Sequence, residues 1–320
     1  MKIKISLILP YYNEKKSVSR TLSLIDSQTI SPDEVIFINS NSSDSTTVFI
    51  DNFIKSKKKI NWHNYNTKLE TPSEAKNFGI NKSKYDWCAF MDFDINFPSN
   101  WIENQITFIS GKKNILVSFG VIKLNPKNYF DRLVISQTYG INSNNPVIPS
   151  SFINKDYFNN FGLFLPYRSF YDKIFIKQAM KNNISFISIN DNNPISYFDI
   201  NYAKNLSELF YKTLNYTIQT VYIDKNIVPY IYLVLLSIFI LLIIIDINYI
   251  PLLFLSTFIL RGLILPIKKN KQFFKIFKLK DIPNIFLIGL FIDFIKCIGF
   301  CVGLVLKILN KKIRLDFIYK

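Results

Sequence analysis

The sequence predicts an α/β domain built on a mainly parallel sheet, followed by a membrane anchor. Two observations lead to this expectation. Between Lys2 and about Asn96, short apolar runs alternate with longer periodic stretches, which is the pattern of βαβ units. Near Ile227 the chain changes to apolar runs long enough to cross a bilayer. We therefore expect a folded domain over residues 1–224 and an anchor over residues 225–320.

The first part of the chain contains four expected strands with helices between them. The expected strands are 3–9, 34–38, 60–65 and 86–91, and the expected helices are 15–27, 44–56 and 72–81. The third helix has a capping box, because Thr71 precedes Pro72 and Glu74 stands at the third helical position. Mixed α/β structure continues with a strand at 115–120, a helix near 171–181 and a strand at 184–189.

Two apolar runs predict a helical hairpin in the membrane. Residues 227–245 are uncharged, and residues 247–267 contain Arg261 as their one charged side chain. Each run matches the roughly 20 residues that a helix needs to cross a bilayer core of about 30 Å. The short segment 246–248 provides the turn between the two expected helices, so both ends of the hairpin lie on one side. The alternative is two buried core helices, but soluble helices of this length show a polar face.

The positive charge indicates which side this is. The chain has a formal net charge of +16, and most of the excess falls within residues 225–320. Residues 268–280 hold six lysines interleaved with aromatic and aliphatic side chains, and the positive-inside rule places this segment and the domain before it in the cytoplasm. Such a segment suits a helix on anionic lipid headgroups, and a solvated linker is the alternative. A nucleic-acid binder is not expected, because the basic residues lie beside the apolar runs.

A last apolar stretch, residues 282–307, carries a polar stripe. On a helix, Gly289, Asp293, Lys296, Gly303 and Lys307 fall within an arc of about 80°. A third crossing would place the basic terminal run KKIRLDFIYK outside, against the positive-inside rule. We therefore expect a membrane-embedded or interfacial helix that returns to the cytoplasmic side of a multi-pass protein of the inner or cytoplasmic membrane.

Cysteine and histidine are too few for two common kinds of site. Cys88, Cys297 and Cys301 do not form a disulfide framework, and His63 is the single histidine. A zinc site of cysteine and histidine ligands is therefore not expected. Any metal would have to be held by oxygen ligands.

The most specific local feature is the sequence MDFD at 91–94. Asp92 and Asp94 flank Phe93 at the end of an expected strand, so both carboxylates can point the same way and hold one hard divalent cation. Water and phosphate would complete the shell of such an ion. The polar segments 10–14 and 39–44 follow two other expected strands, and ligands of open α/β sheets bind at the carboxyl ends of strands. The sequence therefore predicts a ligand site at this edge.

Four segments carry a family resemblance, in order along residues 3–105. They are SLILPYYNE, the Ser-Gln-Thr at 27–29, PDEVIFINSNSSDST and SEAKNFGINKSKYDWCAFMDFDINFPSNWIE. This ordered set resembles the inverting nucleotide-sugar glycosyltransferases of family 2, which have the Rossmann-like GT-A fold. The resemblance implies transfer of a sugar from a nucleoside-diphosphate sugar, with Asp92 and Asp94 as ligands of Mn²⁺ or Mg²⁺. The ion would bridge this pair and the diphosphate and stabilise the leaving group.

The same positional match implies a pocket for the nucleotide sugar. It would be lined by Pro10, Tyr12, Glu14, Asn39, Ser40, Lys76 and Asp92. The family usually has one or two aspartates at the end of the second strand, one of which contacts the base, and this chain has Asn39 and Ser40 there. An amide adds a donor and removes a charge, so base preference stays open, as does loss of nucleotide binding.

The resemblance also implies a catalytic base in the second half of the domain. An inverting transfer needs a carboxylate that takes the proton of the acceptor hydroxyl. In the family this is usually an Asp in a Glu-Asp pair that opens a helix and precedes Arg or Lys. The segment SFYDKIFIKQAMKNN is the best match, which makes Asp172 the candidate and puts Tyr171 in place of the Glu. Asp172 could equally cap the helix, and Asp156 and Asp199 are the alternatives.

The resemblance and the anchor together suggest a function. The leading hypothesis is a transferase that extends a lipid-linked acceptor, a polyprenyl-diphosphate glycan or another glycolipid, in cell-surface polysaccharide biosynthesis. The late segment FIDFIKCIGFCVGLVLK also resembles the final helix of bacterial polysaccharide-assembly transferases. One alternative loads a single sugar onto polyprenyl phosphate. Another is a catalytically inactive, membrane-bound relative that acts as a scaffold. The expected partners are the sugar donor, the lipid-linked acceptor and anionic membrane lipids.

Overall fold

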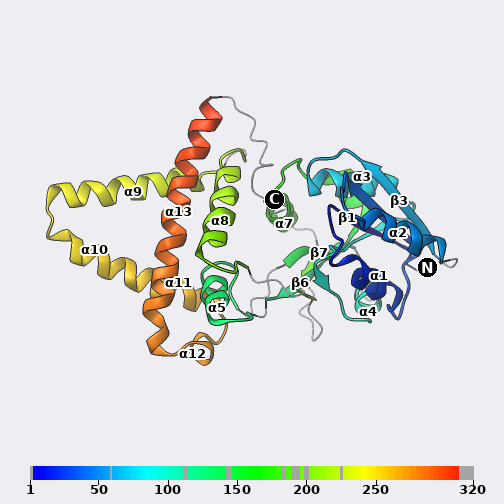
Figure 1. Cartoon of the computed structure of the whole chain (residues 1–320), viewed down its shortest axis with the longest axis horizontal. Helices are drawn as coiled ribbons and strands as arrows, with labels where there is room; N and C mark the ends of the chain where they lie inside the picture. Colours follow the sequence, from blue (N-terminus) through cyan, green and yellow to red (C-terminus); the bar gives the residue numbers. More distant parts are fainter. Residues whose placement is uncertain are drawn as a thin grey trace. The chain divides into compact units, whose positions relative to one another are not determined.

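The structure, a computed structural model, divides into two compact units (Figure 1). It describes residues 3–57, 60–110, 114–124, 126–141, 146–181, 185–188, 195–197, 202–223 and 226–309. The first unit comprises the described residues within Met1–Lys123 and Asn144–Asp199. The second comprises those within Leu124–Ser143 and Ile200–Lys320. Residues 124–143 and the helix at 206–220 therefore belong with the apolar helices.

The first unit is built on a mixed sheet. Its strands are β1 (Ile5–Tyr11), β2 (Glu34–Ser40), β3 (Asn61–Thr67), β4 (Trp87–Phe90), β5 (Ile95–Asn96), β6 (Ile115–Lys123), β7 (Pro146–Asn154), β8 (Ser185–Ser188) and β9 (Ile195–Tyr197). Their order is β3-β2-β1-β4-β7-β6-β9-β5, and β8 pairs with β6. Strands β1, β2, β3 and β4 all run parallel to one another, whereas β7 runs antiparallel to β4 and β6. The expected α/β class is confirmed.

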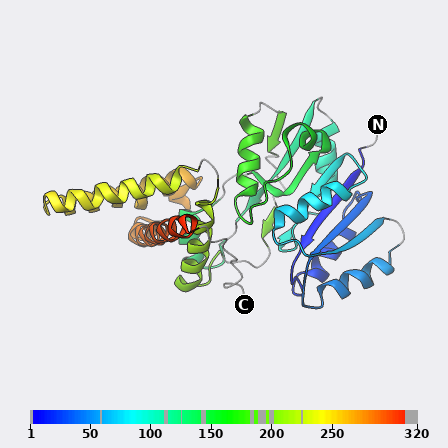
Figure 2. The same ribbon diagram turned by 90° about the horizontal axis from the view of Figure 1, so that it is seen from above.

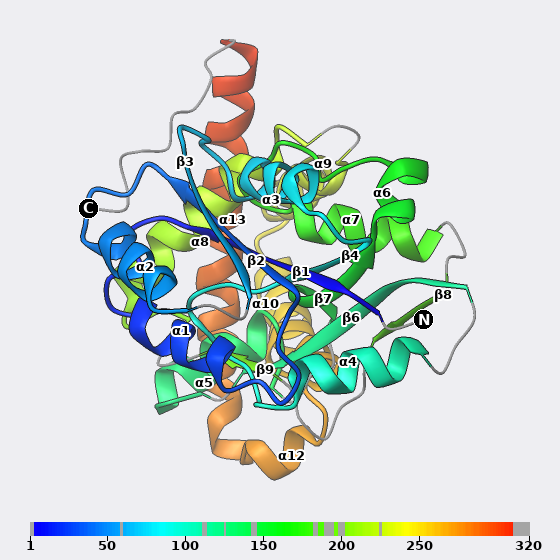
Figure 3. The same cartoon turned by 90° about the vertical axis from the view of Figure 1, so that its right-hand side faces the viewer.

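Helices cover both faces of this sheet (Figure 3). One face carries α3 (Pro72–Lys82), α6 (Lys155–Phe161) and α7 (Tyr171–Lys181). The other carries α1 (Val18–Asp26), α2 (Thr46–Lys55) and α4 (Trp101–Ser110). Because they are covered on both faces, β1 and β2 are buried along almost their whole length, and their central residues 7–9 and 35–38 are all apolar.

The elements expected for the first half are present with ends shifted by up to three residues. The capping box of α3 is confirmed, since Thr71 Oγ1 accepts a hydrogen bond from Glu74 N at 3.2 Å and Glu74 Oε2 accepts one from Thr71 N at 3.0 Å. The strand expected at 184–189 is β8, and residues 184 and 189 lie outside the described part. Helix α4, helix α6 and strand β7 were not expected from the sequence.

The second unit is helical. It contains α5 (Tyr129–Gln137), α8 (Leu206–Thr220), α9 (Val228–Ile245), α10 (Tyr249–Phe258), the π-helical turn η1 (Ile259–Ile264), α11 (Leu265–Lys269), α12 (Phe273–Ile276), the 3₁₀ turn η2 (Leu279–Asp281) and α13 (Ile282–Ile308). The two arms of the expected hairpin are α9 and the continuous run α10–η1–α11, with the turn at 246–248. The hairpin is therefore confirmed as a structural element.

Three helical segments of this unit are long and apolar enough to cross a membrane: Val228–Ile245, Tyr249–Lys269 and Leu279–Ile308. The hairpin arms expose most of their large apolar side chains, and Pro229 is the one buried residue of α9. Helix α13 differs, because one of its faces is buried by other helices. Exposed apolar helices of this length indicate association with a membrane.

Helix α13 lies crosswise to the hairpin and packs against α5 and α8 (Figures 1 and 2). A Cβ atom at Gly289 would lie 3.0 Å from Gln137 Nε2 of α5, and one at Gly303 would lie 2.8 Å from a methyl carbon of Val221, just beyond α8. At Gly299 a Cβ would approach Thr217 to 2.8 Å. The small members of the expected stripe thus allow α5 and α8 to approach α13 closely.

The lysine-rich segment 268–280 is not one amphipathic helix. It contains the four-residue helix α12 and the turn η2. Phe273 and Phe277 are only 3% and 1% exposed, because they pack into the core of the second unit with Leu133 and Ile285. The expectation of one continuous helix is therefore wrong, and two of the three aromatic side chains of the segment are used inside the protein.

Candidate active site

Three polar loops meet at the carboxyl edge of the sheet. The register pairs Tyr11 of β1 with Asn39 of β2, and Asn39 with Asn66 of β3. On the other side of β1, Ile8 pairs with Phe90 of β4. Segments 10–14, 39–44 and 91–94 therefore leave neighbouring strands at the same edge, as the sequence predicted. Pro10 pairs with Ile38 of β2, one residue before the end of β1.

The first two loops are tied together by hydrogen bonds. Asn13 has a φ of 56°, and in this left-handed conformation its Oδ1 accepts from Ser43 N at 2.8 Å. Asp44 accepts from Lys15 N and from Thr46 N, both at 3.0 Å. Although burial alone would raise it, a hydrogen bond from Thr46 Oγ1 and these two backbone hydrogen bonds hold the pKa of Asp44 below its usual value. Asp44 is therefore a connector between the loop after β1 and helix α2.

Asn39 is 6% exposed and its amide is fully engaged. Its Nδ2 donates to Asn66 Oδ1 at 2.9 Å and to Thr47 Oγ1 at 3.1 Å, and its Oδ1 accepts from Ser42 N at 2.8 Å. A carboxylate could not make the two donations. The asparagine is thus matched to its neighbours, while Ser40 next to it ends β2 half-buried.

The Asp92–Phe93–Asp94 turn is anchored in the domain by its central residue. Phe93 is 2% exposed, and its ring centroid lies 5.7 Å from that of Tyr11. Its carbonyl oxygen accepts from Thr21 Oγ1 at 2.9 Å and from Arg20 Nη2 at 3.2 Å. Both bonds come from α1, so the helix fixes the peptide between the two aspartates.

Lys76 reaches the turn from α3. The side chain is 1% exposed, and its Nζ lies 2.9 Å from Asp92 Oδ1. Burial would lower the pKa of Lys76, but Asp92 and Tyr171 raise it above its ordinary value, so the side chain is a buried ammonium. One cation is therefore paired with one of the two aspartates.

The other carboxylates of the site, Asp94 and Glu14, lie close to further negative charge. Burial, followed by the charges of Asp92 and Glu14, raises the pKa of Asp94 to about 7. Burial also raises the pKa of Glu14, and the charge of Asp92 raises it further. A 2.5 Å hydrogen bond from Ser17 Oγ acts in the opposite direction and lowers it. Clustered carboxylates with raised pKa values are typical of functional sites, and they favour a bound cation.

A divalent cation fits this donor set through the pair alone. Among the described residues, no group of three or more His, Cys, Asp or Glu side chains could hold a metal ion. Asp92 and Asp94 offer oxygen atoms, which suit Mg²⁺ or Mn²⁺ and leave most coordination positions to water and phosphate. Tyr12 is 55% exposed at the same edge, so it is open to a ligand.

Helix α7 brings Asp172 into this neighbourhood. The ring centroid of Tyr171, the first residue of α7, lies 5.8 Å from Lys76 Nζ. Burial raises the pKa of Tyr171 to about 12, so its hydroxyl stays neutral. Asp172 follows it in the first turn and acts on the same phenol electrostatically. The first turn of α7 thus adjoins the Lys76–Asp92 pair.

The two alternative bases fare differently. Asp156 follows Asn154, which pairs with Trp87 at the beginning of β4. It therefore lies at the opposite edge of the sheet from Asp92 and is removed from the candidates. Asp199 lies outside the described residues.

Two residues that support the site were not singled out from the sequence. Arg20 gave no signal in the sequence. Asn13 lies in a polar loop after a strand, and asparagine is a residue type that tolerates the left-handed conformation.

Comparison with known proteins decides the family. The family model described as "Glycosyl transferase family 2" matches residues 6–182. The chain belongs to glycosyltransferase family 2. The match includes all of the segments that converge at the carboxyl edge, together with helix α7. The resemblance stated from the sequence is confirmed, and the family is one of enzymes.

Individual relatives match over shorter stretches. The chain is 35% identical over 106 residues to an uncharacterized glycosyltransferase of Rickettsia bellii, covering 33% of this chain and 15% of the relative. It is 29% identical over 113 residues to glycosyltransferase AglE of Haloferax volcanii, covering 33% and 36%. The chain thus spans well under half the length of these curated relatives.

A solved structure shows the fold. The mannosyltransferase PcManGT from Pyrobaculum calidifontis, in complex with GDP-Man and Mn²⁺, matches with a TM-score of 0.54 and 12% identity. The match covers 98% of this chain and 89% of the other. The likeness confirms the GT-A fold that the sequence resemblance implied.

Proposed function

We propose that this protein transfers a sugar from a nucleoside-diphosphate sugar to a lipid-linked acceptor in the membrane, with inversion at the sugar carbon. The observation that supports it most is the Asp92–Phe93–Asp94 turn at the carboxyl edge of a GT-A sheet, between Glu14 and the buried Lys76. The exposed apolar hairpin in the same chain supports an acceptor that stays in the bilayer. The product would serve cell-surface polysaccharide biosynthesis.

The acidic turn would hold the diphosphate end of the donor. A divalent cation bound by Asp92 and Asp94 would supply positive charge to the leaving diphosphate, and the solved PcManGT complex contains Mn²⁺. Lys76 fixes one Asp92 oxygen at 2.9 Å and neutralises part of the acidic charge before the donor arrives. The cation proposed here is Mn²⁺ or Mg²⁺.

The nucleoside end would lie over the first two loops. Pro10, Tyr12 and Glu14 come from one loop and Asn39 and Ser40 from the next. Because the amide of Asn39 is engaged with Asn66, Thr47 and Ser42, base recognition would depend mainly on the loop backbone and on Tyr12.

Asp172 would act as the base. It would take the proton from the acceptor hydroxyl as that oxygen attacks the sugar carbon opposite the leaving diphosphate, in one displacement. Tyr171, the residue before it, lies beside Lys76 and stays neutral, so Asp172 is the carboxylate of this first turn. The base and the leaving-group side of the site would thus be supplied by different segments, α7 and the turn after β4.

The proposed division is a catalytic domain over residues 1–224 and an anchor over 225–320, with helices α5 and α8 of the first range packed on the anchor in the second unit. The hairpin α9 and α10–α11 would cross the bilayer, with both ends and the catalytic domain on the cytoplasmic side. Helix α13 would lie in the interface, because it packs along α5 and α8. A crossing α13 would draw charged side chains into hydrocarbon, among them Glu208 and Lys212 of α8, which form a 2.9 Å ion pair.

The test uses full-length protein purified in detergent with Mn²⁺. UDP-, GDP- and dTDP-sugars are screened for hydrolysis, and the active donor is then offered with polyprenyl phosphate or with a polyprenyl-diphosphate sugar. Transfer to the glycosylated lipid supports the proposal. Transfer to polyprenyl phosphate alone would instead make the protein a monoglycosyltransferase. Silence with all three donors would contradict catalysis and favour an inactive scaffold, the alternative that the engaged Asn39 amide motivates.

A further inference from the structure

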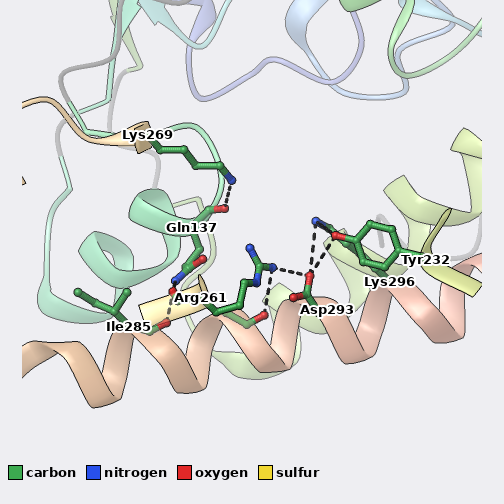
Figure 4. A network of polar contacts seen from close by, with 8 residues as sticks. Gln137, Tyr232, Arg261, Lys269, Ile285, Asp293 and Lys296 are labelled. Atoms are coloured by element: carbon green, nitrogen blue, oxygen red, sulfur yellow. Dashed lines mark hydrogen bonds and ion pairs between the residues drawn. The ribbon is translucent and has the colours of Figure 1, made fainter. Parts of the chain in front are cut away.

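Charged side chains meet between the apolar helices of the second unit (Figure 4). Arg261 of η1 donates from Nη2 to a carboxylate oxygen of Asp293 on α13, and to Gly289 O at 3.2 Å. The Tyr232 hydroxyl of α9 donates to Asp293 Oδ1 at 3.1 Å. Lys296 Nζ lies 3.2 Å from that hydroxyl and 4.0 Å from Asp293 Oδ1. We call Tyr232, Arg261, Asp293 and Lys296 the polar cluster.

The polar cluster has an excess of positive charge. It contains two cations and one carboxylate. In the described span 226–309, the other acidic side chains are Asp246, at the hairpin turn, and Asp281, which accepts a hydrogen bond from Tyr129 at 2.9 Å. Neither belongs to the cluster. A net charge of this kind between apolar helices is costly and marks a functional site by default.

One side of the cluster is closed and the other is open. Arg261 is 6% exposed, and its Nε is buried without a hydrogen-bond partner among the described residues. By contrast, the side chains of Lys296 and Asp293 are 31% and 28% exposed. The guanidinium therefore holds the inner side, while the ammonium faces outward beside Tyr232. A ligand can reach the cluster from the Lys296 side.

The backbone around Arg261 is itself unusual. Residues Ile259–Ile264 form a π-helical turn within the second hairpin arm, and Arg261 and Gly262 are its two buried residues. A Cβ at Gly262 would lie 3.3 Å from a methyl carbon of Ile282, so the turn packs closely on the beginning of α13. Single π-helical turns within α-helices occur frequently at functional sites. This one directs Arg261 toward α13.

The polar cluster lies in the half of the hairpin that contains the beginning of α9 and the end of α11, opposite the turn. Tyr232 is four residues into α9, and Arg261 is eight residues before Lys269. At 1.5 Å per residue, these positions are about 6 Å and about 12 Å from the two ends of the hairpin. The turn at 246–248 is at the far end. With the long side chain of Lys296 reaching outward, the cluster is within reach of lipid headgroups beside Lys268 and Lys269.

We infer that the polar cluster binds the phosphate group of a membrane lipid. Phosphate oxygens accept hydrogen bonds from an ammonium such as that of Lys296, the anion balances the excess charge, and the buried Arg261 adds to the attraction. Two lipids carry this chemistry: the phosphate next to the polyprenyl chain of the acceptor, and the headgroup of an ordinary phospholipid. The inference rests on the proposed insertion of the hairpin in the membrane and does not depend on the sugar donor.

The test measures lipid binding by native mass spectrometry of the full-length protein in detergent. The probes are a polyprenyl phosphate, phosphatidic acid and phosphatidylcholine. Lys296→Gln removes one positive charge and should weaken binding of the two phosphomonoesters roughly fivefold, whereas Lys296→Arg should retain it. Asp293→Asn raises the net charge of the cluster and should tighten binding by a similar factor. Lys275→Gln removes an equal charge from an exposed position outside the cluster and should change binding less than about twofold.

Each outcome is decisive. Preference for polyprenyl phosphate supports an acceptor site, and equal binding of phosphatidic acid supports a headgroup site. Wild-type affinity in Lys296→Gln and Asp293→Asn, together with a lower melting temperature, would overturn the inference and leave an interhelical ion pair. An equal loss in Lys275→Gln would also overturn it, as diffuse attraction. Flotation with vesicles separates the two proposals, because a wild-type protein that does not float contradicts the proposed membrane insertion itself.

Discussion

Lys76 Nζ lies 2.9 Å from Asp92 Oδ1, and the lysine side chain is 1% exposed. The ammonium is therefore committed to one carboxylate of the acidic turn and is shielded from water. Asp94, the other member of the pair, has its pKa raised by burial first and by Asp92 and Glu14 next. The site thus contains one ion pair and more carboxylates than cations.

Lys76→Met should abolish most turnover. Removing the ammonium leaves Asp92 without its partner beside Asp94 and Glu14, and loss of one preorganised electrostatic group costs about 10²- to 10³-fold in rate. The rate is measured with the active nucleotide sugar and Mn²⁺. As a control for misfolding, Lys76→Met/Asp92→Asn should recover melting temperature but not activity, since it removes the unpaired charge along with its partner. A fully active Lys76→Met protein would show that the pair has only a structural role.

Asn39→Asp should destabilise the protein rather than restore a family-like pocket. The substitution replaces a donor that serves Asn66 and Thr47 with an acceptor, and a buried polar group left unpaired costs about 1–3 kcal/mol. Denaturant or thermal unfolding of the two proteins gives the difference. Ser40→Asp, one residue on and half-buried, is the matched control and should lose less. Equal stability of Asn39→Asp and wild type would mean that Asn66 reorients freely.

Asp44 should contribute to stability in a pH-dependent way. Its folded-state pKa is lowered by hydrogen bonds from Thr46 and Lys15, so the contribution is present above the unfolded value near 3.9. It is lost as the pH falls through the lower folded pKa. Because the carboxylate is partly exposed, Asp44→Asn should cost about 1 kcal/mol or less at pH 7. Chemical unfolding between pH 7 and pH 3 should show the gap between the two proteins closing, and a constant gap would contradict the assignment.

Gly303→Val should separate α8 from α13. A Cβ at this position would already lie 2.8 Å from a methyl carbon of Val221 and 3.0 Å from Ile218 O, so the larger side chain has no room. Overpacking of this kind costs typically 1–3 kcal/mol, which thermal unfolding in detergent measures. Cys301→Val, an exposed position on the same helix, is the control and should leave stability nearly unchanged. If both variants unfold alike, the close packing of α8 on α13 is not significant.

The sequence was most informative where the determinants are local. Alternating apolar runs predicted β1 to β4, and Thr71 with Glu74 predicted the beginning of α3, because strand burial and capping depend on neighbouring residues. The Asp92–Asp94 pair and its meeting with the other loops followed from the rule for carboxyl ends of parallel strands. The resemblance implied that Lys76 lines the nucleotide-sugar pocket, but its pairing with Asp92 was not predicted.

Contacts between distant segments were not predictable in this way. Helix α5 joins the second unit because Gln137 donates to Arg261 O at 2.7 Å and to Ile285 O at 2.9 Å, more than a hundred residues away. Phe273 and Phe277 looked available for lipid, yet they fill the core beside Leu133. Nothing in the local pattern distinguishes an aromatic side chain that meets lipid from one that meets another helix.

The measurement that tests the central claim most directly is Mn²⁺-dependent nucleotide-sugar turnover by wild type and by Asp94→Ala. Asp94 contributes one of the two oxygen-donor groups of the turn, so its loss should abolish the activity and also the rise in melting temperature on adding Mn²⁺. Asp86→Ala, at an exposed position before the opposite end of β4, should keep both. Unchanged turnover in Asp94→Ala would contradict the assignment of the acidic turn as the catalytic metal site.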